Sequence, residues 1–249
     1  MFKTLKARFI QGYRTGTFPK TEPTLPDRFQ GRPIISSDAT EADVVLAAGV
    51  CPVKAILTVD GKLAIDTGRC LFCGRCAEVC PHITFSKQHR LATFTRESLF
   101  ITAQSPAIPD DAPDPDFRKL CGKSFKIRQV SAGARAACEL DFNVLNTLAW
   151  DLGRFGIQVV ASPRHADAIL VTGPVTDNMK LALQKTFDAM AKPSWVIACG
   201  ACAISGGIYA ESPTTSSGVS SMLKPALYIP GCPPHPTTIL EGLLRLMGR

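Results

Sequence analysis

Residues 68–81 read GRCLFCGRCAEVCP and place cysteines at positions 70, 73, 76 and 80. The spacing C-x2-C-x2-C-x3-C-P is typical of a [4Fe–4S] site, because one tight loop presents three thiolates to three corners of a cubane. A structural zinc site instead pairs two distant C-x-x-C knuckles. The run therefore predicts a [4Fe–4S] cluster held by Cys70, Cys73 and Cys76.

The fourth ligand of this cluster is expected from an upstream segment. Where two such clusters lie together, the last cysteine of each run binds the other cluster. Residues 41–52, EADVVLAAGVCP, have the length of such a run, but Glu41, Val44 and Ala47 stand where its first three cysteines would be. We expect Cys51 to complete the first cluster, and apolar residues to fill the space of a lost partner cluster. In the alternative, Cys80 closes the cluster itself, which would strain a short loop.

The composition is that of a globular protein with metal-binding cysteines. The chain has 249 residues, 45% of them hydrophobic and 20% charged, with a formal net charge of +7. Its start is locally basic, as a segment near anionic lipid would be, but no aromatic-interleaved basic stripe indicates nucleic acid. No apolar run reaches the ~18 residues of a membrane-spanning helix, and the first residues lack the apolar core of a secretory signal. We therefore expect a cytoplasmic chain. In that reducing compartment cysteines seldom form disulfides, so we expect the ten cysteines of this chain to include metal ligands.

A Pro/Asp-rich segment divides the chain. Residues 105–116, SPAIPDDAPDPD, carry four prolines and four aspartates and predict a linker. Residues 1–104 form the expected [4Fe–4S] domain, and residues 117–249 form the second domain. There, short apolar runs predict strands over residues 157–161, 168–172, 195–198 and 226–229, and helical periodicity predicts helices over 139–154, 177–190 and 238–247. This alternation predicts an α/β domain with a parallel sheet, in which Cys202 and Cys232 follow strands at the ligand-binding edge.

The first half resembles the ferredoxin-like subunits of complex I and of formate hydrogenlyase. The resemblance rests on the basic start, on Thr15-Gly16-Thr17, on the degenerate motif at 41–52 and on the run at 68–81. It implies an α+β ferredoxin-like fold. That family carries two cubanes, so the substitutions at residues 41–47 imply the loss of one.

The second half resembles the small cluster-bearing component shared by complex I (its B-type subunit) and energy-converting [NiFe] hydrogenases, which implies a flavodoxin-like fold. The matching motifs are RFGI (154–157), SPRHAD (162–167), VTGPVT (171–176), GAC (200–202) and IPGCPP (229–234). The family binds one [4Fe–4S] cluster through four cysteines. Cys138, Cys202 and Cys232 match three of them, whereas Arg135 or Ala137 stands at the fourth position.

Three outcomes are open at this second site. Cys199 supplies the fourth sulfur, or the site holds a three-thiolate cluster, or no cluster binds and the cysteines are buried core thiols. Glu139 is either a proton-relaying group or a first-turn glutamate favoured by the helix dipole.

Together these resemblances imply a fusion of two relay subunits that performs no bond chemistry and has no catalytic residue. It would pass electrons to or from a large catalytic subunit of the hydrogenase or complex I D-subunit type, beside membrane-embedded ion-translocating subunits. It would then lie on the cytoplasmic face of the inner membrane through that complex. An adaptor with one functional cluster, and a free ferredoxin-type carrier, are the rival hypotheses.

Overall fold

A computed structural model describes residues 2–249. The second half is built on a five-stranded sheet of order β10-β9-β8-β6-β7, in which all neighbouring strands are parallel. The strands are β6 (Phe125–Ser131), β7 (Ile157–Val159), β8 (Ala168–Thr172), β9 (Trp195–Cys199) and β10 (Leu227–Ile229). Every residue of β8, β9 and β10 is buried, as expected for parallel strands covered on both faces. The predicted parallel sheet is confirmed.

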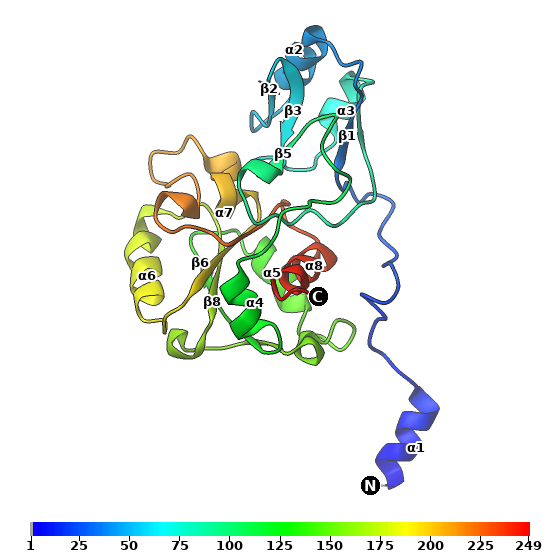
Figure 1. Ribbon diagram of the computed structural model, residues 1–249, viewed down its shortest axis with the longest axis vertical. Coiled ribbons are helices and arrows are strands. Elements are labelled where there is room, and N and C mark those ends of the chain that lie inside the picture. Colours follow the sequence, from blue (N-terminus) through cyan, green and yellow to red (C-terminus); the bar gives the residue numbers. More distant parts are fainter. Residues whose placement is uncertain (1) are drawn as a thin grey trace.

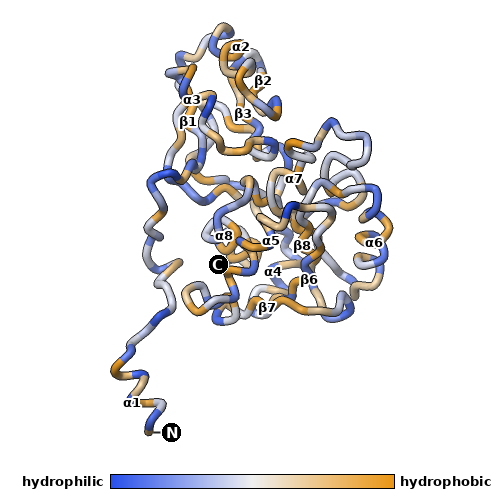
Figure 2. The backbone as a smooth tube through the Cα atoms, turned by 180° about the vertical axis from the view of Figure 1, so that it is seen from behind, coloured by the Kyte–Doolittle hydropathy of each residue, from blue (hydrophilic) through white to orange (hydrophobic). Residues whose placement is uncertain are grey.

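Helices cover both faces of this sheet (Figure 1). On one face lie α4 (Pro115–Cys121), α5 (Ala137–Val144) and α8 (Pro236–Leu246), and on the other lie α6 (Asp177–Asp188) and α7 (Ala201–Ser205). Side chains along β9 alternate between the two cores: Ile197 and Cys199 pack with Phe142 of α5, whereas Val196 packs with Leu183 of α6. Helices α5 and α8 lie side by side on this face of the sheet (Figure 2).

Two sequence expectations in this half differ from the structure. Strand β6 was not predicted, because Lys126 and Arg128 interrupt its apolar run, although β6 lies between β8 and β7. The expected helix over 139–154 is wrong beyond Val144, where α5 ends. The Thr147 hydroxyl there donates to the Val144 carbonyl at 2.7 Å, and such local side-chain bonds compete with helix continuation.

The first half contains two antiparallel sheets. Strands β2 (Ile56–Val59), β3 (Lys62–Asp66) and β5 (Phe100–Ile101) form one, and β1 (Pro33–Ile35) pairs with β4 (Ile83–Phe85) in the other. Helix α2 (Glu41–Gly49) starts at a capping box between Thr40 and Asp43, and α3 (Arg75–Val79) carries part of the cysteine run. Ala47 of α2 is fully buried, in a core that also contains Cys70, Cys76 and Cys80. A ferredoxin-like fold for this half stays a prediction.

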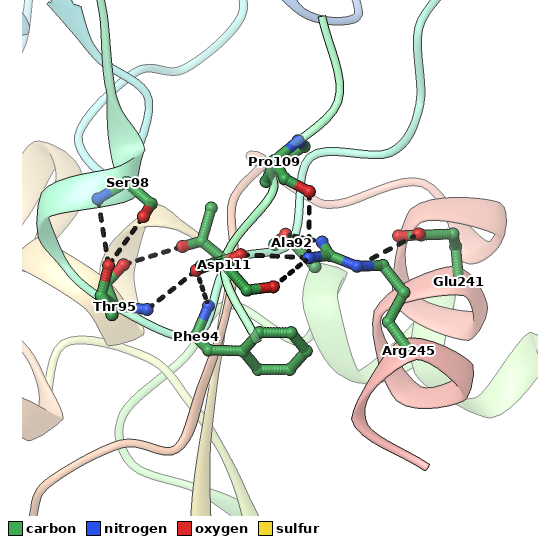
Figure 3. Close-up of polar contacts among 9 residues, drawn as sticks. Ala92, Phe94, Thr95, Ser98, Pro109, Asp111, Glu241 and Arg245 are labelled. Atoms are coloured by element: carbon green, nitrogen blue, oxygen red, sulfur yellow. Dashed lines mark hydrogen bonds and ion pairs between the residues drawn. The ribbon is translucent and has the colours of Figure 1, made fainter. Parts of the chain in front are cut away.

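The Pro/Asp-rich segment packs against the second half. Arg245 of α8 donates to both the carbonyl and the carboxylate of Asp111 and to the Pro109 carbonyl (Figure 3). The same Asp111 carboxylate accepts from the backbone N–H groups of Phe94 and Thr95. Asp114 caps α4 and accepts from the indole N–H of Trp195 at 2.9 Å. The predicted linker is thus fixed by charged contacts, and its last two residues, 115 and 116, already belong to α4.

Helix α1 (Phe2–Gln11) lies apart from both halves (Figure 1). Between it and β1, residues 12–32 contain neither helix nor strand. Over residues 2–249, every helix is too short or too polar to cross a bilayer.

Candidate iron–sulfur sites

Four cysteines of the first half line one cavity. Cys51 follows α2, Cys70 and Cys73 lie in the loop between β3 and α3, and Cys76 lies on α3. Cys70 and Cys76 are buried, Cys51 is half-buried and Cys73 is exposed. The structure therefore brings together the four side chains that the sequence predicts for the first cluster, although Cys51 comes from a separate segment, before β2 and β3.

Backbone N–H groups near these cysteines donate hydrogen bonds to their sulfur atoms. The N–H of Ala55 donates to the Cys51 sulfur at 3.2 Å, and the N–H of Phe72 donates to the Cys70 sulfur at 3.3 Å. The loop turns through positive φ angles of 53° at Phe72 and 78° at Gly74. Such N–H···S bonds stabilise negative charge on a sulfur-rich centre.

The pKa values of the two buried thiols in this group are raised. Burial, with a smaller contribution from the neighbouring cysteines, raises the pKa of Cys70 to about 12. Burial likewise raises the pKa of Cys76 to about 11, again with help from its cysteine neighbours. A thiolate at either buried position would need a compensating positive charge, which ligated iron would supply. The residues present therefore fit a [4Fe–4S] cluster.

Cys80 lies outside this group. It is fully buried, and its thiol faces the Asp43 carboxylate of α2 at 3.8 Å. It does not line the cavity of the other four cysteines. This geometry supports Cys51 over Cys80 as the fourth ligand, although the ligand set itself stays a prediction.

The second cysteine group lies at the carboxyl ends of the parallel strands. Cys138 is on α5 after β6, Cys202 is on α7 after β9, and Cys232 follows β10. The Cys138 sulfur is so close to Gly200 that a Cβ at position 200 would lie 2.6 Å from it. Burial, together with the nearby Cys202 and Glu139, raises the pKa of Cys138 to about 12. The structure thus brings these three side chains to one edge of the sheet, and their role as ligands stays a prediction.

The fourth position of this second group differs from the other three, and its ligand stays a prediction. Arg135 places its Nη2 atom 4.0 Å from the Cys232 sulfur and its guanidinium over the Tyr209 ring. Cys199 is fully buried in the sheet core on the α5 and α8 face, and its pKa is raised by burial and by the nearby Cys138. Ala137 is the first residue of α5. Cys138, Cys202 and Cys232 would supply three thiolates to a cluster, and Arg135 cannot supply a fourth ligand because a guanidinium cannot ligate iron.

Glu139 lies next to Cys138 at this edge of the sheet. It accepts a hydrogen bond from the Thr172 hydroxyl at 2.6 Å, while its other carboxylate oxygen is buried without a partner.

Within residues 2–249, no three His, Cys, Asp or Glu side chains converge closely enough to hold a single metal ion.

The structure also shows contacts between the two cysteine groups that the sequence analysis missed. The Ser205 hydroxyl of α7 lies 3.0 Å from the Gly68 carbonyl, two residues before Cys70, and equally close to the Ala201 carbonyl of its own helix, so its one proton is shared between the two acceptors. A cavity of about 260 Å³ is lined by Leu71 and Phe72 from the first cluster loop and by Cys232 from the second. Apart from lying close to a cysteine in the sequence, neither Gly68 nor Ser205 belongs to a pattern that predicts this contact.

Comparison with known proteins agrees with this division of the chain. Residues 63–82 match the 4Fe-4S binding domain, which confirms the predicted [4Fe–4S] cofactor. Residues 136–246 match the family described as NADH ubiquinone oxidoreductase, 20 Kd subunit. The probable membrane-bound hydrogenase subunit mbhJ of Pyrococcus furiosus is 36% identical over 126 residues, which are 51% of this chain and 75% of the relative.

The chain belongs to the 20 Kd subunit family. Another relative, the B-type subunit of NADH-quinone oxidoreductase from Phocaeicola vulgatus, is 43% identical over 114 residues, 45% of this chain. The chain spans 58% of that relative's length. A chain in the structure of the membrane-bound sulfane sulfur reductase, an archaeal respiratory membrane complex, is 31% identical with a TM-score of 0.46, over 54% of this chain and 75% of that one. In this 20 Kd family member the cysteine run at 68–81 precedes the family region.

Proposed function

We propose that the chain is an electron-relay subunit of a membrane-associated oxidoreductase complex. The observation that carries the proposal is the hydrogen bond from Ser205 to the Gly68 carbonyl. It joins the loop that leads into Cys70 to the helix that carries Cys202. When bound, a [4Fe–4S] cluster accepts and releases one electron at a potential set by burial and hydrogen bonds. The role of the chain is to keep the two cysteine groups at a fixed separation.

Further contacts hold the two halves together. Thr93 and Tyr228 exchange backbone hydrogen bonds of 2.9 and 2.8 Å, so the segment after the first cluster loop is paired with β10. Lys54 forms an ion pair with Glu211, beyond α7. Ile204 packs where a Cβ at Gly68 would lie. These contacts fix the first cluster loop beside α7 by packing as well as by the single hydrogen bond.

The family relatives suggest the partners. One relative is named as a membrane-bound hydrogenase subunit and another as an NADH-quinone oxidoreductase subunit. We propose that this chain likewise lies against a large catalytic subunit of the hydrogenase or complex I D-subunit type, beside membrane-embedded ion-translocating subunits. It would then be held at the cytoplasmic face of the inner membrane, with bond chemistry confined to the partner. The first half would be a ferredoxin-like subunit fused to the family domain.

Iron analysis combined with EPR tests the relay. Two occupied sites give about eight irons per chain, and one gives about four. In anaerobically purified full-length protein, we expect Cys70→Ser to remove the first cluster and Cys202→Ser to remove a second, distinct EPR signal. Cys121→Ser, at a buried thiol of α4 remote from both groups, is the matched control. A relay between two clusters is excluded if Cys202→Ser changes neither iron content nor spectrum.

A second candidate function is favoured by one observation. Arg135 lies against Cys232 where a further ligand would be needed. A chain with only the first cluster would act as a structural adaptor that delivers electrons directly to a partner. About four irons per chain, with no spectral change in Cys202→Ser, would support this function.

A further inference from the structure

Helix α1 presents an apolar face that nothing in the described chain covers. Every residue of α1 is exposed, including Phe9 at 93% and Phe2 at 84%. Figures 1 and 2 both show the helix at the far end of an extended segment, away from both halves. Large aromatic side chains are seldom left in water in this way without a partner surface.

The two faces of α1 have different chemistry. Phe2, Leu5 and Phe9 recur at the spacing that aligns side chains on one helix face. Lys6 and Arg8 flank this face on its two sides, at the positions expected from 3.6 residues per turn. The helix contains no acidic residue, and the first one in the sequence is Glu22. Basic residues in the same stretch are Lys3, Lys6, Arg8, Arg14 and Lys20.

Helix α1 is too short to be stable by itself. Isolated helices of fewer than about 12–15 residues are marginal in water, and α1 has 10 residues and no buried side chain. Without acidic residues it has no internal ion pairs to support it. A surface that receives Phe2, Leu5 and Phe9 would stabilise the helix.

We propose that α1 lies in the headgroup region of an anionic phospholipid bilayer, with its apolar face directed toward the acyl chains. Short helices with aromatic and aliphatic residues on one face and lysine and arginine on the other bind such interfaces. Charge complementarity selects anionic lipid, because basic residues border the apolar face on both sides and no carboxylate offsets them. Residues 12–32 form no helix or strand and begin at Gly12, whose φ is 65°, so the connection allows α1 to lie along a surface beside the body. The interaction is independent of whether the second cysteine group binds a cluster.

Co-sedimentation of the full-length protein with vesicles tests this directly. We expect binding to vesicles that contain phosphatidylglycerol, weak binding to phosphatidylcholine alone, and loss of binding as salt is raised. The double variant Lys3→Gln/Lys6→Gln should weaken binding by about fivefold for each charge removed. Phe9→Ser should weaken it by at least about tenfold. Because α1 packs on neither half, these variants should keep the thermal unfolding midpoint and iron content of the wild type.

The control is the exposed surface of α6. Leu181→Ser and Lys185→Gln remove an exposed apolar and an exposed basic side chain from that helix and should leave vesicle binding unchanged. The proposal is overturned if wild-type protein stays in the supernatant with phosphatidylglycerol vesicles, or if the α1 variants bind as wild type does. It is also overturned if the α6 variants lose as much binding as those in α1. If α1 does not bind vesicles but cross-links to a protein subunit in the purified complex, its partner is a groove on that subunit and the proposal is overturned.

Discussion

The guanidinium of Arg135 lies 4.0 Å from the sulfur of Cys232, at the edge of the sheet where Cys138 and Cys202 also lie. Burial raises the pKa of Cys232, and the positive charge of Arg135 acts in the opposite direction. Arg135 therefore favours a thiolate at Cys232.

Replacing Arg135 with cysteine should increase metal binding at this group. Arg135→Cys adds a thiolate next to Cys232, and we expect more iron and sulfide per chain than in Arg135→Ala, which removes the guanidinium without adding a ligand. Chemical iron and sulfide determination after anaerobic reconstitution measures the difference. Equal iron in the two variants would show that the position is not within ligand reach of the cluster.

Cys51 and Cys80 offer a matched pair for the first cluster. Both precede a proline, but only Cys51 lines the cavity with Cys70, whereas Cys80 faces Asp43. Cys51→Ser should strongly reduce the [4Fe–4S] absorbance and EPR signal, while Cys80→Ser should keep both and lose about 1 kcal/mol of stability through its buried thiol. The reverse pattern would assign the fourth ligand to Cys80.

Gly68 should not tolerate a side chain. A Cβ at this position would lie 2.8 Å from Ile204 and 2.9 Å from Leu99, both in the packed interface between the halves. Gly68→Ala should therefore destabilise the protein by about 1–3 kcal/mol and loosen the Ser205 contact. Gly49→Ala, at the end of α2 where no atom lies within 4 Å of the added Cβ, should unfold at or slightly above the wild-type midpoint in the same thermal denaturation series, because alanine is favoured over glycine in a helix. Equal unfolding midpoints for both variants would mean that the interface accommodates the added methyl group at Gly68 without loss of stability.

Glu241 should make the stability of the chain pH-dependent. Burial raises the pKa of Glu241 to about 7, despite the opposing charges of Arg245 and Arg90. An unfolded glutamate has a pKa near about 4.3, so the native state holds the proton more tightly and its contribution to stability falls as pH rises from about 4.3 to about 7.

The test compares wild type with Glu241→Gln by denaturant unfolding at several pH values. We expect the variant to gain stability relative to wild type across this window, reaching a few kcal/mol above about pH 7, because a neutral amide avoids the buried charge. Arg245 keeps its contact with Asp111 in this variant (Figure 3). A difference between the two proteins that does not change with pH would contradict the assignment.

Much of the architecture could be predicted from local pattern. The apolar runs of β8 and β9 mark buried parallel strands, and α6 begins at the predicted residue, Asp177. The sequence pattern does not predict strand β6, because its exposed lysine and half-buried arginine interrupt the apolar run. It predicts too long a helix after Cys138, because periodic leucines such as Leu152 are buried from a 3-10 turn and not from a continuous helix. Periodicity reports which side chains are buried but not always the backbone conformation that buries them.

By itself, the sequence determined the chemistry: thiolates at the spacing of an iron–sulfur run, Cys51 as the expected partner of that run, a basic start and an alternation of strands and helices. Tertiary structure alone decided where the other cysteines and Arg135 lie. Cys51 joins Cys70 while Cys80 turns to Asp43, Cys199 lies in the apolar core, and Arg135 lies against Cys232. The physical reason is that ligand sets depend on the direction of side chains from distant segments, and packing between those segments fixes that direction.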